Sequence, residues 1–320
     1  MDAVVGLLDG VRARGAFVLR MMLDPPWSMR IQDEAPLTLI CQTHGRAVIA
    51  GESSGTVWLD AGDVALTRGT EHYVFADDPD TEPMVVIHPG QRCTTLSGDD
   101  LRFEMSLGVR TWGNSVSGSD RSIVCAYEGR SEVSARLLGA LPTVLVLRAQ
   151  ELDTPLIELL AEEAGRDGSG QEAYLDRLLD LLLIAVLRTW FGREGNAPAW
   201  WDAEHDPVVG PAVRLIYNNP AHPWTVANLA AAVGSSRALF ARRFTELVGE
   251  PPIAFLTGWR LALAADLLRS SEATIAAVAR QVGYSTPFAL SSAFKRAYGV
   301  SPNTHRSTAA YPADSLEPAL

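Results

Sequence analysis

Two segments in the last third of the chain match each other position by position. Residues 225–252, TVANLAAAVGSSRALFARRFTELVGEPP, align with residues 274–302, TIAAVARQVGYSTPFALSSAFKRAYGVSP, when one residue is inserted in the second copy. Gly234 then matches Gly283. Because matching residue types occupy matching places, both copies are expected to fold into the same unit.

Each copy predicts two short helices joined by a tight turn. Thr225 or Thr274 can cap the first helix, and Gly234 or Gly283 can reverse the chain through a positive φ. A serine is then expected to cap the second helix. The side chains that face inward from the second helices are expected to be Phe240, Phe244, Leu290 and Phe294. This pattern is a helix-turn-helix, present twice.

The two ends of the chain carry opposite charge. Residues 1–205 hold 17 Arg and 31 Asp or Glu, a net charge of −14, whereas residues 207–306 hold 10 Lys or Arg and 4 Asp or Glu, a net charge of +6. A basic domain attached to an acidic one indicates that polyanion binding is confined to one end.

The link between the two copies has the composition of a long helix, PIAFLTGWRLALAADLLRS. Two helix-turn-helix units joined in this way can place their outer helices in successive major grooves, roughly 34 Å apart. Small outward residues beside cations favour this arrangement over two helical hairpins that only pack together. The sequence therefore predicts a domain that reads double-stranded DNA.

The run IAAVARQVGYSTPFALSSAFKRAYGVSPNTHR, which ends at Arg306, resembles the C-terminal motif of AraC/XylS-type transcription regulators. The resemblance implies base-reading positions in both second helices, with phosphate contacts beside them. The implied base-reading residues are Arg237, Ala238, Ala241 and Arg242 in the first unit and Thr286, Phe288, Ser291 and Ser292 in the second, and the implied phosphate contacts are Arg260, Lys295 and Arg296. It also implies a promoter operator, RNA polymerase as a partner, a homodimer and an activating role.

Specificity is expected to come mainly from the first unit. The guanidinium of Arg242 can bind guanine O6 and N7 through two hydrogen bonds. In the second unit, Ser292 stands where many relatives carry an arginine, and Phe288 offers only apolar contact, for instance to a thymine methyl group. The second unit is therefore expected mainly to position the protein on the DNA backbone.

The N-terminal half has the rhythm of a small antiparallel barrel or sandwich. From Gly15 to Val86, short β-rich runs alternate with Gly, Asp, Pro and Ser turns at a spacing of roughly ten residues. The runs are LTLICQT, RAVIA, TVWLD, VALT, HYVFA and MVVIH, and two further runs, RSIVCAYEG and TVLVLRAQ, extend or flank them.

Two helical patterns follow, TPLIELLAEEAG and EAYLDRLLDLLLIAVLRTWFG. The second is hydrophobic over most of its circumference, so it needs burial on more than one side. Two alternatives stay open: the helix packs inside its own chain, or it forms a homodimer seam that includes Leu179 and Leu183.

The N-terminal half also resembles the cupin-like effector domains found ahead of such DNA-binding units. In GDVALTRGTEHYVFA, Gly62, Gly69 and His72 have the spacing of the second cupin motif, although the usual proline and asparagine are replaced. The first motif, which would supply two histidines and a glutamate to a metal, is absent around His44. The resemblance implies a regulatory barrel that has lost its metal, so no metal and no cofactor are expected.

Several side chains in this half are candidates for an effector or redox site. His72 is expected to be a buried, hydrogen-bonded structural histidine, with effector contact as the alternative. A soft metal site would require the candidates to gather on one barrel face. Cys93, beside Arg92, would sense oxidants if its pKa were lowered. The full set of candidates is Cys41, His44, His72, His88 and Cys93.

Together these features predict a multidomain α and β protein. The expected parts are a cupin-like sensor (1–150), a helical linker that dimerises (151–205), a double helix-turn-helix domain (206–306) and a flexible tail (307–320). The predicted function is a sequence-specific transcription regulator whose sensor responds to a small molecule or a redox signal. One alternative is a cupin-type enzyme with an accessory helical domain, and another is a constitutive DNA-binding protein whose degenerate barrel serves as a dimer scaffold.

The remaining features narrow the class of protein. The chain carries no P-loop, HExxH or GxSxG motif, so no catalytic residue is predicted. The three cysteines are widely spaced and suit a reducing compartment. The longest apolar run, residues 181–187, is too short to cross a bilayer. A cytoplasmic protein with no membrane partner is expected.

Overall fold

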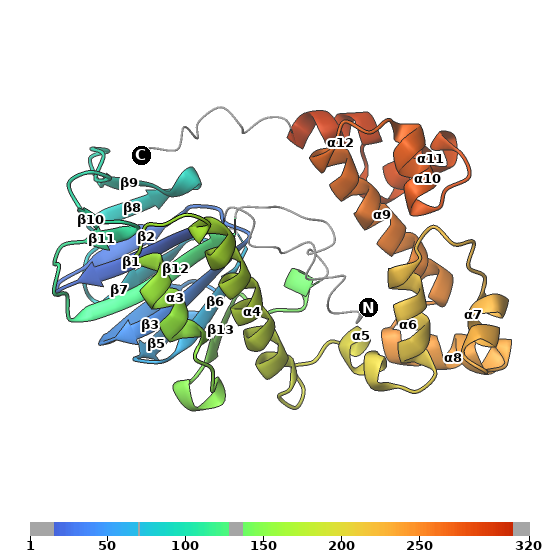
Figure 1. Cartoon of the computed structure of the whole chain (residues 1–320), viewed down its shortest axis with the longest axis horizontal. Helices are drawn as coiled ribbons and strands as arrows, with labels where there is room; N and C mark the ends of the chain where they lie inside the picture. The colour runs from blue at the N-terminus through green and yellow to red at the C-terminus, as the bar shows by residue number, and fades with distance from the viewer. Residues whose placement is uncertain (1–15, 70, 128–136, 310–320) are drawn as a thin grey trace. The chain divides into compact units, whose positions relative to one another are not determined.

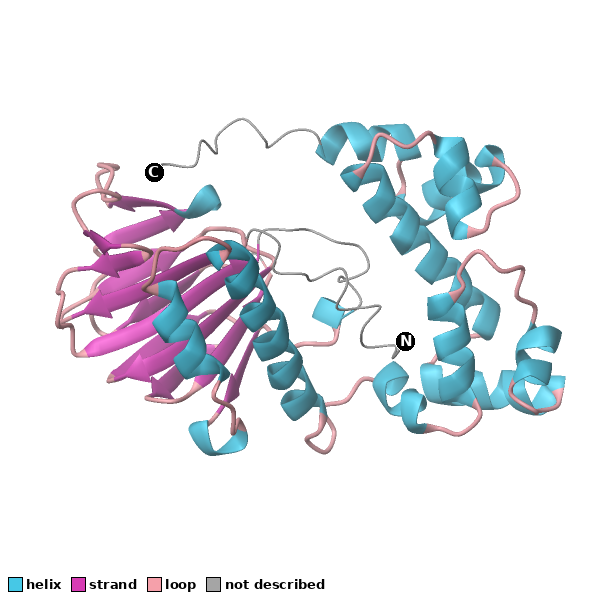
Figure 2. Ribbon diagram, viewed as in Figure 1, coloured by secondary structure: helices cyan, strands magenta, loops and turns pink. Residues whose placement is uncertain are grey.

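The computed structural model describes residues 16–69, 71–127 and 137–309. The chain divides into two compact units, made mainly of residues 12–130 with 138–196 and of residues 197–320. In Figure 2 the strands all belong to the first of these, and the second contains helices and loops. We refer to them as the sheet unit and the helical unit.

The sheet unit contains two β-sheets (Figure 1). The seven-stranded sheet has the order β10 (Ser106–Gly108), β11 (Thr111–Gly113), β1 (Phe17–Leu23), β12 (Asp120–Tyr127), β3 (Leu37–His44), β6 (Val64–Arg68) and β13 (Val144–Leu147). The six-stranded sheet has the order β5 (Gly55–Asp60), β4 (Arg46–Gly51), β7 (Tyr73–Ala76), β2 (Ser28–Ile31), β8 (Val85–His88) and β9 (Arg92–Thr95). Every run predicted as a strand is one. Two strand pairs, β1 with β11 and β2 with β8, are parallel, unlike the expected antiparallel pattern.

The side chains of the strands alternate between two environments. Met21 and Ile40 of the larger sheet and Met29 and Phe75 of the smaller one belong to one hydrophobic core between the sheets. Successive side chains of a strand face opposite ways. Ile123, next to the core-facing Val124, and its cross-strand partner Cys41 therefore point to the other side of the larger sheet. The larger sheet therefore needs a cover on its outer face.

Helices α3 (Leu156–Ala164) and α4 (Gln171–Phe191) provide that cover, with α3 in contact with β1 and α4 with β13. Leu179 and Leu183 of α4 are almost completely buried within the chain, and the hydroxyl of Tyr127 donates a hydrogen bond to the carbonyl of Leu179 at 3.4 Å. The first alternative for α4, packing inside its own chain, is confirmed. The proposed dimer seam through Leu179 and Leu183 is wrong, because both side chains already lie in a core.

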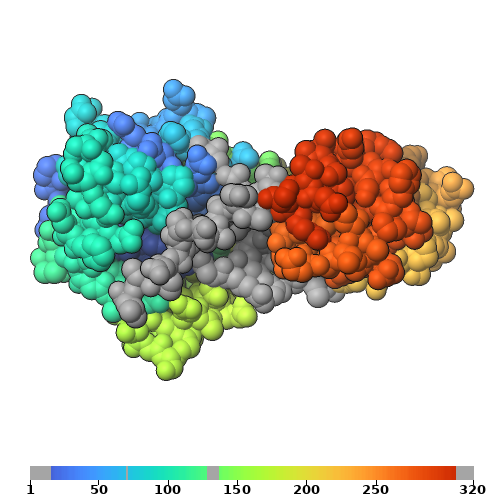
Figure 3. Space-filling model, turned by 90° about the horizontal axis from the view of Figure 1, so that it is seen from above, coloured from blue at the N-terminus to red at the C-terminus, as the bar shows by residue number. Residues whose placement is uncertain are grey.

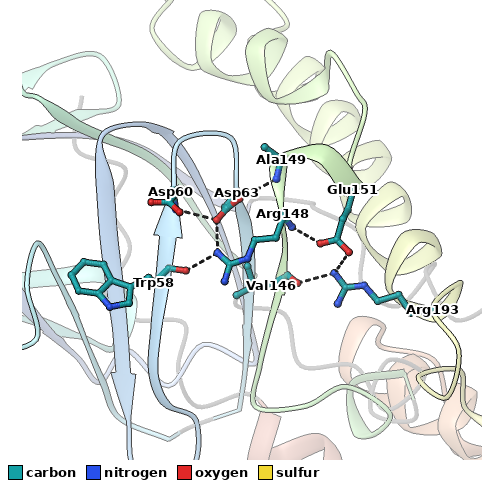
Figure 4. A network of polar contacts seen from close by, with 8 residues as sticks. All are labelled: Trp58, Asp60, Asp63, Val146, Arg148, Ala149, Glu151 and Arg193. Carbon is teal, nitrogen blue, oxygen red and sulfur yellow. Dashed lines mark hydrogen bonds and ion pairs between the residues drawn. The ribbon is translucent and has the colours of Figure 1, made fainter.

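Within the sheet unit, a polar network holds the residues just after α4 against β13 (Figure 4). Arg148 Nη1 donates to Asp63 Oδ2 at 2.6 Å and to the carbonyl of Trp58 at 2.9 Å. Glu151 accepts from the Arg148 amide and from Arg193 Nη2, each at 2.7 Å. Since Asp63 is buried, its charge requires this partner. The network fixes the residues at which the chain leaves the sheet unit.

The helical unit consists of short helices around one long helix. Its elements are α5 (Ala199–Asp202), the 3₁₀ turn η3 (Ala203–His205), α6 (Val209–Asn218), α7 (Val226–Ala232), α8 (Arg237–Val248), α9 (Pro252–Ser270), α10 (Ile275–Val282), α11 (Pro287–Tyr298) and α12 (Pro302–Ala309). In Figure 3 the orange and red atoms of α9 to α12 form one continuous body. No helix among the described residues is both long and apolar enough to cross a membrane.

The compact units differ in detail from the predicted division of the chain. Residues 151–196 belong to the sheet unit, and α5 and η3 contact α6 and α8 of the helical unit. The predicted linker, residues 151–205, is therefore divided between the two units and is not a separate part of the chain. Of the predicted tail, residues 307–309 belong to α12, and residues 310–320 lie outside the described residues.

Candidate nucleic-acid interface and sensor cavity

The first helix-turn-helix unit consists of α7 and α8. Thr225 Oγ1 accepts a hydrogen bond from the Asn228 amide at 3.2 Å, and the Asn228 side chain accepts from the Thr225 amide at 2.6 Å. Gly234 turns the chain with a φ of 67°. Ser236 Oγ then accepts from the Leu239 amide at 3.3 Å and caps α8. The predicted threonine cap, glycine turn and serine cap are all confirmed here.

The second unit consists of α10 and α11 and repeats the design with one change. Thr274 Oγ1 accepts from the Ala277 amide at 3.2 Å, and Gly283 has a φ of 89°. The second helix is capped by Thr286, whose Oγ1 accepts from the Ala289 amide at 3.1 Å. The prediction of a serine cap is wrong in this unit, because the inserted residue brings a threonine to the cap position.

Both units bury the side chains predicted to face inward. Phe240 and Phe244 are fully buried with their ring centroids 5.6 Å apart, and Phe244 lies 5.6 Å from Phe255 of α9. Leu290 and Phe294 are equally buried, in a cluster that includes the C-terminal half of α9. One long helix therefore supplies the core of both units.

The opposite face of each second helix is open to solvent. The Arg242 side chain is 70% exposed and lies 3.7 Å from the Glu246 carboxylate, and Phe288 is 80% exposed. Most of the other residues predicted to contact DNA are also exposed: Arg237, Ala238, Thr286, Ser292, Lys295 and Arg296. Ala241 and Ser291 are half-buried. Each second helix thus presents one accessible face whose residues are those implied by the family resemblance.

Arg260 of α9 lies between the loop that precedes the first helix-turn-helix unit and the turn of the second. Its Nε donates to the carbonyl of Pro220 at 2.7 Å, and its Nη2 donates to the carbonyl of His222 at 2.8 Å. A Cβ on Gly283 would lie 2.7 Å from the Ala221 Cα and 2.8 Å from Arg260 Nη2. The loop before α7 therefore touches the turn of the second unit. Partial burial lowers the pKa of Arg260, which has a structural role here, and its phosphate contact stays a prediction.

An ion pair anchors the first reading helix alone. Arg243 Nε donates to Asp206 Oδ2 at 2.8 Å, and Asp206 Oδ1 accepts from the amides of Val208 and Val209, both at 2.9 Å. The hydrogen bond from Arg243 is the main cause that lowers the pKa of Asp206 to about 2. Arg243 matches Ala293 in the repeat, so α11 lacks this anchor.

The sheet unit contains a cavity between its two sheets. The cavity is partly open to solvent, and the space in it that is not filled by protein atoms is about 520 Å³ when that open solvent is included. The residues that line it come from both sheets and from the segments beside them: Phe17, Leu19, Met21, Met29, Ile31, Asp33, Thr38, Ile40, Tyr73, Phe75, Ile87, Gln91, Cys93, Trp112 and Val124. Sequence reasoning found only Cys93 of this set, since the cavity depends on which strands pair.

The predicted effector and redox residues do not gather at one place. His72 is exposed, so its prediction as a buried histidine is wrong: it lies just before β7, which begins at Tyr73, and of these two residues only Tyr73 lines the cavity. His44 is also exposed. Cys41 lies beside Ile40, which lines the cavity, and therefore points to the outer face of the sheet.

His88 and Cys93 lie near one another, on the paired strands β8 and β9. His88 is hydrogen-bonded to Gln32 at 3.2 Å and to Thr94 at 2.9 Å. Burial raises the pKa of Cys93 to about 11, so the prediction of a lowered pKa is wrong, and the thiol stays protonated near neutral pH. No group of three or more His, Cys, Asp or Glu among the described residues could hold a metal ion.

Comparison with known proteins agrees with this two-part architecture. A family model described as "Cupin" matches residues 2–192, and one described as "Helix-turn-helix domain" matches residues 229–308. A putative AraC-like transcription regulator of Streptomyces lividans is 28% identical over 96% of this chain and 98% of its own length. The HTH-type transcriptional regulator AlkR of Acinetobacter baylyi is 27% identical over 96% of this chain and 99% of its own.

A third relative matches over a shorter stretch. A putative AraC-like transcription regulator of Streptomyces antibioticus is 44% identical over 41% of this chain, which spans 44% of that protein's length. The two full-length relatives and the two family models together cover both units. With a cupin domain followed by two helix-turn-helix units, the chain belongs to the AraC/XylS family of DNA-binding transcription regulators.

Proposed function

We propose that the exposed faces of α8 and α11 enter successive major grooves of a promoter operator. Arg242 is the principal base-reading residue, because its guanidinium is 70% exposed on the side of α8 opposite the buried Phe240 and Phe244. Around it, Arg237, Ala238 and Ala241 allow close approach to the bases. In the second unit the corresponding set is Thr286, Phe288, Ser291 and Ser292.

Phosphate contacts flank these faces in the proposed complex. Lys295 and Arg296 are exposed in the last turn of α11, where a cation also interacts favourably with the helix dipole. Arg260 remains a candidate with its guanidinium partly engaged by backbone carbonyls. Such contacts position the protein without reading sequence.

The cavity of the sheet unit is the proposed effector site. A ligand that binds one arrangement of the protein better than another shifts the population toward that arrangement and so changes the affinity for DNA. The network around Arg148 and Glu151 ties Arg193, just after α4, to the rest of the sheet unit, and so holds the segment from which the chain continues toward the helical unit. A small molecule is favoured over a redox signal because Cys93 stays a thiol.

The remaining partners follow from the family. A homodimer would use the solvent side of α4, where Tyr174 and Leu181 are about half exposed, instead of the buried Leu179 and Leu183. Activation through RNA polymerase, in the cytoplasm where the operator DNA lies, completes the proposal.

The test compares wild type with Arg242→Ala on the DNA upstream of the coding region and on a shuffled sequence, by fluorescence anisotropy across a salt series. Loss of a bidentate base contact should weaken binding to the operator by about 1–3 kcal/mol, with a much smaller loss on shuffled DNA. Arg166→Ala, an equal charge change at an exposed arginine of the sheet unit, is the control and should alter neither. An equal loss of affinity on both DNAs would make Arg242 a phosphate contact. If wild type binds the upstream DNA and the shuffled DNA equally, with and without effector, the proposed sequence-specific recognition of that operator is contradicted.

A further inference from the structure

The lining of the cavity in the sheet unit has a distinctive chemistry. Hydrocarbon, aromatic and sulfur-containing side chains make up most of it, and the described lining residues include no Lys, Arg or His. A buried anion requires a cation or several hydrogen-bond donors to replace its hydration. The described lining offers no cation for that purpose, and the buried Trp112 Nε1, which has no hydrogen-bond partner, is a single donor, so a carboxylate or phosphate ligand would be poorly accommodated.

Asp33, the single charged residue in the described part of the lining, is already engaged. Its Oδ2 accepts a hydrogen bond from Gln91 Nε2 at 2.8 Å, and its Oδ1 accepts from the Ala35 amide at 3.2 Å. The charge of Asp33 adds to burial in raising the pKa of Tyr73, so the negative potential reaches into the cavity. Asp33 therefore repels anions, and its own hydrogen bonds reduce its capacity to pair with a cationic ligand.

Apolar residues of the cavity are also less covered than their position in the strands would suggest. Leu19, Ile31, Ile87 and Val124 pack against the core between the sheets, yet each keeps part of its surface free. These side chains come from β1, β2, β8 and β12, which belong to both sheets. The free apolar surface on both sides of the cavity is complementary to a hydrocarbon or aromatic ligand.

We infer that the cavity binds an uncharged, mainly apolar small molecule, an inference that rests on the proposed effector role of this site but concerns the chemistry of its ligand. A neutral ligand loses little hydration on entry and gains contact with the free apolar surface. The lining determines the class of ligand, and this holds whether the ligand increases or decreases the affinity for DNA.

The experiment uses the purified full chain and three probes of equal chain length, octan-1-ol, octanoate and octylammonium, with binding measured by calorimetry at pH 7. The expected result is that octan-1-ol binds and that each charged probe binds about tenfold or more weakly. Octanoate or octylammonium binding as tightly as octan-1-ol would overturn the inference, as would the absence of binding by octan-1-ol.

A pair of matched variants locates the binding. Val124→Phe fills the cavity and should weaken octan-1-ol binding about tenfold, whereas Val116→Phe, the same substitution at an exposed valine, should change it by less than about twofold. Circular dichroism establishes whether each variant is folded, and the charge series on wild type decides the ligand class if Val124→Phe is not. Equal binding by a folded Val124→Phe would overturn the assignment to this cavity.

DNA binding is measured separately, with and without octan-1-ol. Binding of octan-1-ol in the cavity with no change in operator affinity would support the ligand class and contradict the proposed effector role. If a charged probe binds more tightly than octan-1-ol and changes the operator affinity, the effector role is supported and the inferred ligand class is contradicted.

Discussion

The helices α8 and α11 are built alike and differ in what they present to solvent. Each begins at a hydroxyl cap, buries apolar side chains on one face and ends at a glycine with positive φ. On the outward face, however, Arg242 of α8 matches Ser292 of α11. The buried half of the repeat maintains the fold, and the exposed half is free to specialise.

The same comparison extends to how each helix is held. Arg243 of α8 pairs with Asp206, whereas its match in α11 is Ala293. Of the two helices, α8, which carries the exposed Arg242, is thus also the one with this ion-pair anchor. Four predictions test this division, from the largest expected effect to the smallest.

The first concerns the shared core. Phe244→Ala and Phe294→Ala should each lower the free energy of unfolding by about 3–5 kcal/mol, because each leaves a cavity in a fully buried site. Urea unfolding followed by circular dichroism measures both. Phe288→Ala, at an 80% exposed position, is the control and should stay within about 0.5 kcal/mol of wild type. A small effect of either buried substitution would mean that the units are not built alike.

The second concerns Arg260, which joins the units. Arg260→Ala should lower the free energy of unfolding by about 1.5–3 kcal/mol through loss of its hydrogen bonds to Pro220 and His222. If positioning is its main role, the dependence of DNA affinity on salt should be unchanged. Arg296→Ala is the matched comparison and should reduce the slope of log affinity against log salt by about 0.9 with little loss of stability. The same slope change in Arg260→Ala would restore its predicted phosphate contact.

The third concerns the anchor of α8. Because the pKa of Asp206 falls from its ordinary value of 3.8 to about 2, its stabilising contribution is fully present above pH 3.8 and is lost as the pH falls through 2. Asp206→Asn should lower the free energy of unfolding by about 1–2 kcal/mol at pH 7, a figure reduced to allow for the 44% exposure of Arg243. The difference from wild type should shrink toward pH 2. Asp167→Asn, at an exposed aspartate, is the control and should stay within about 0.5 kcal/mol of wild type at pH 7.

The fourth concerns the apolar face of α11. If Phe288 contacts a thymine methyl group, replacing thymine by uracil in the second half-site should weaken wild-type binding by about 0.8 kcal/mol, the value of one buried methyl group. Phe288→Ala should bind both DNAs equally. Equal discrimination by Phe288→Ala and wild type would place the methyl contact elsewhere, and Ser292→Ala serves as the control on the same helix.

The helix-turn-helix units could be predicted in detail, and so could eight of the thirteen strands in the described part of the sheet unit, whereas no predicted run covers β1, β2, β9, β10 or β11. The repeat identified the inward Phe240 and Phe244, the caps at Thr225 and Thr274 and the glycine turns, because each depends on residues within about four positions of one another. The β-rich runs likewise coincide with strands. The serine cap failed in the second unit because a single inserted residue changed which hydroxyl stands at the start of α11.

Other features depended on residues far apart in the sequence, and local pattern could not supply them. The exposure of His72, the burial of Leu179 and the raised pKa of Cys93 are consequences of which strands pair and which face α4 covers. The role of Arg260 depends on a loop 38 to 40 residues earlier.

By itself, the sequence determined the two DNA-binding units and the residues that each places inside or outside, since helix periodicity and capping are local. Only the tertiary structure decided where the cavity lies and which side chains line it. The cavity is lined from both sheets by residues between Phe17 and Val124, and side chains so distant along the chain meet only when strand pairing brings them together.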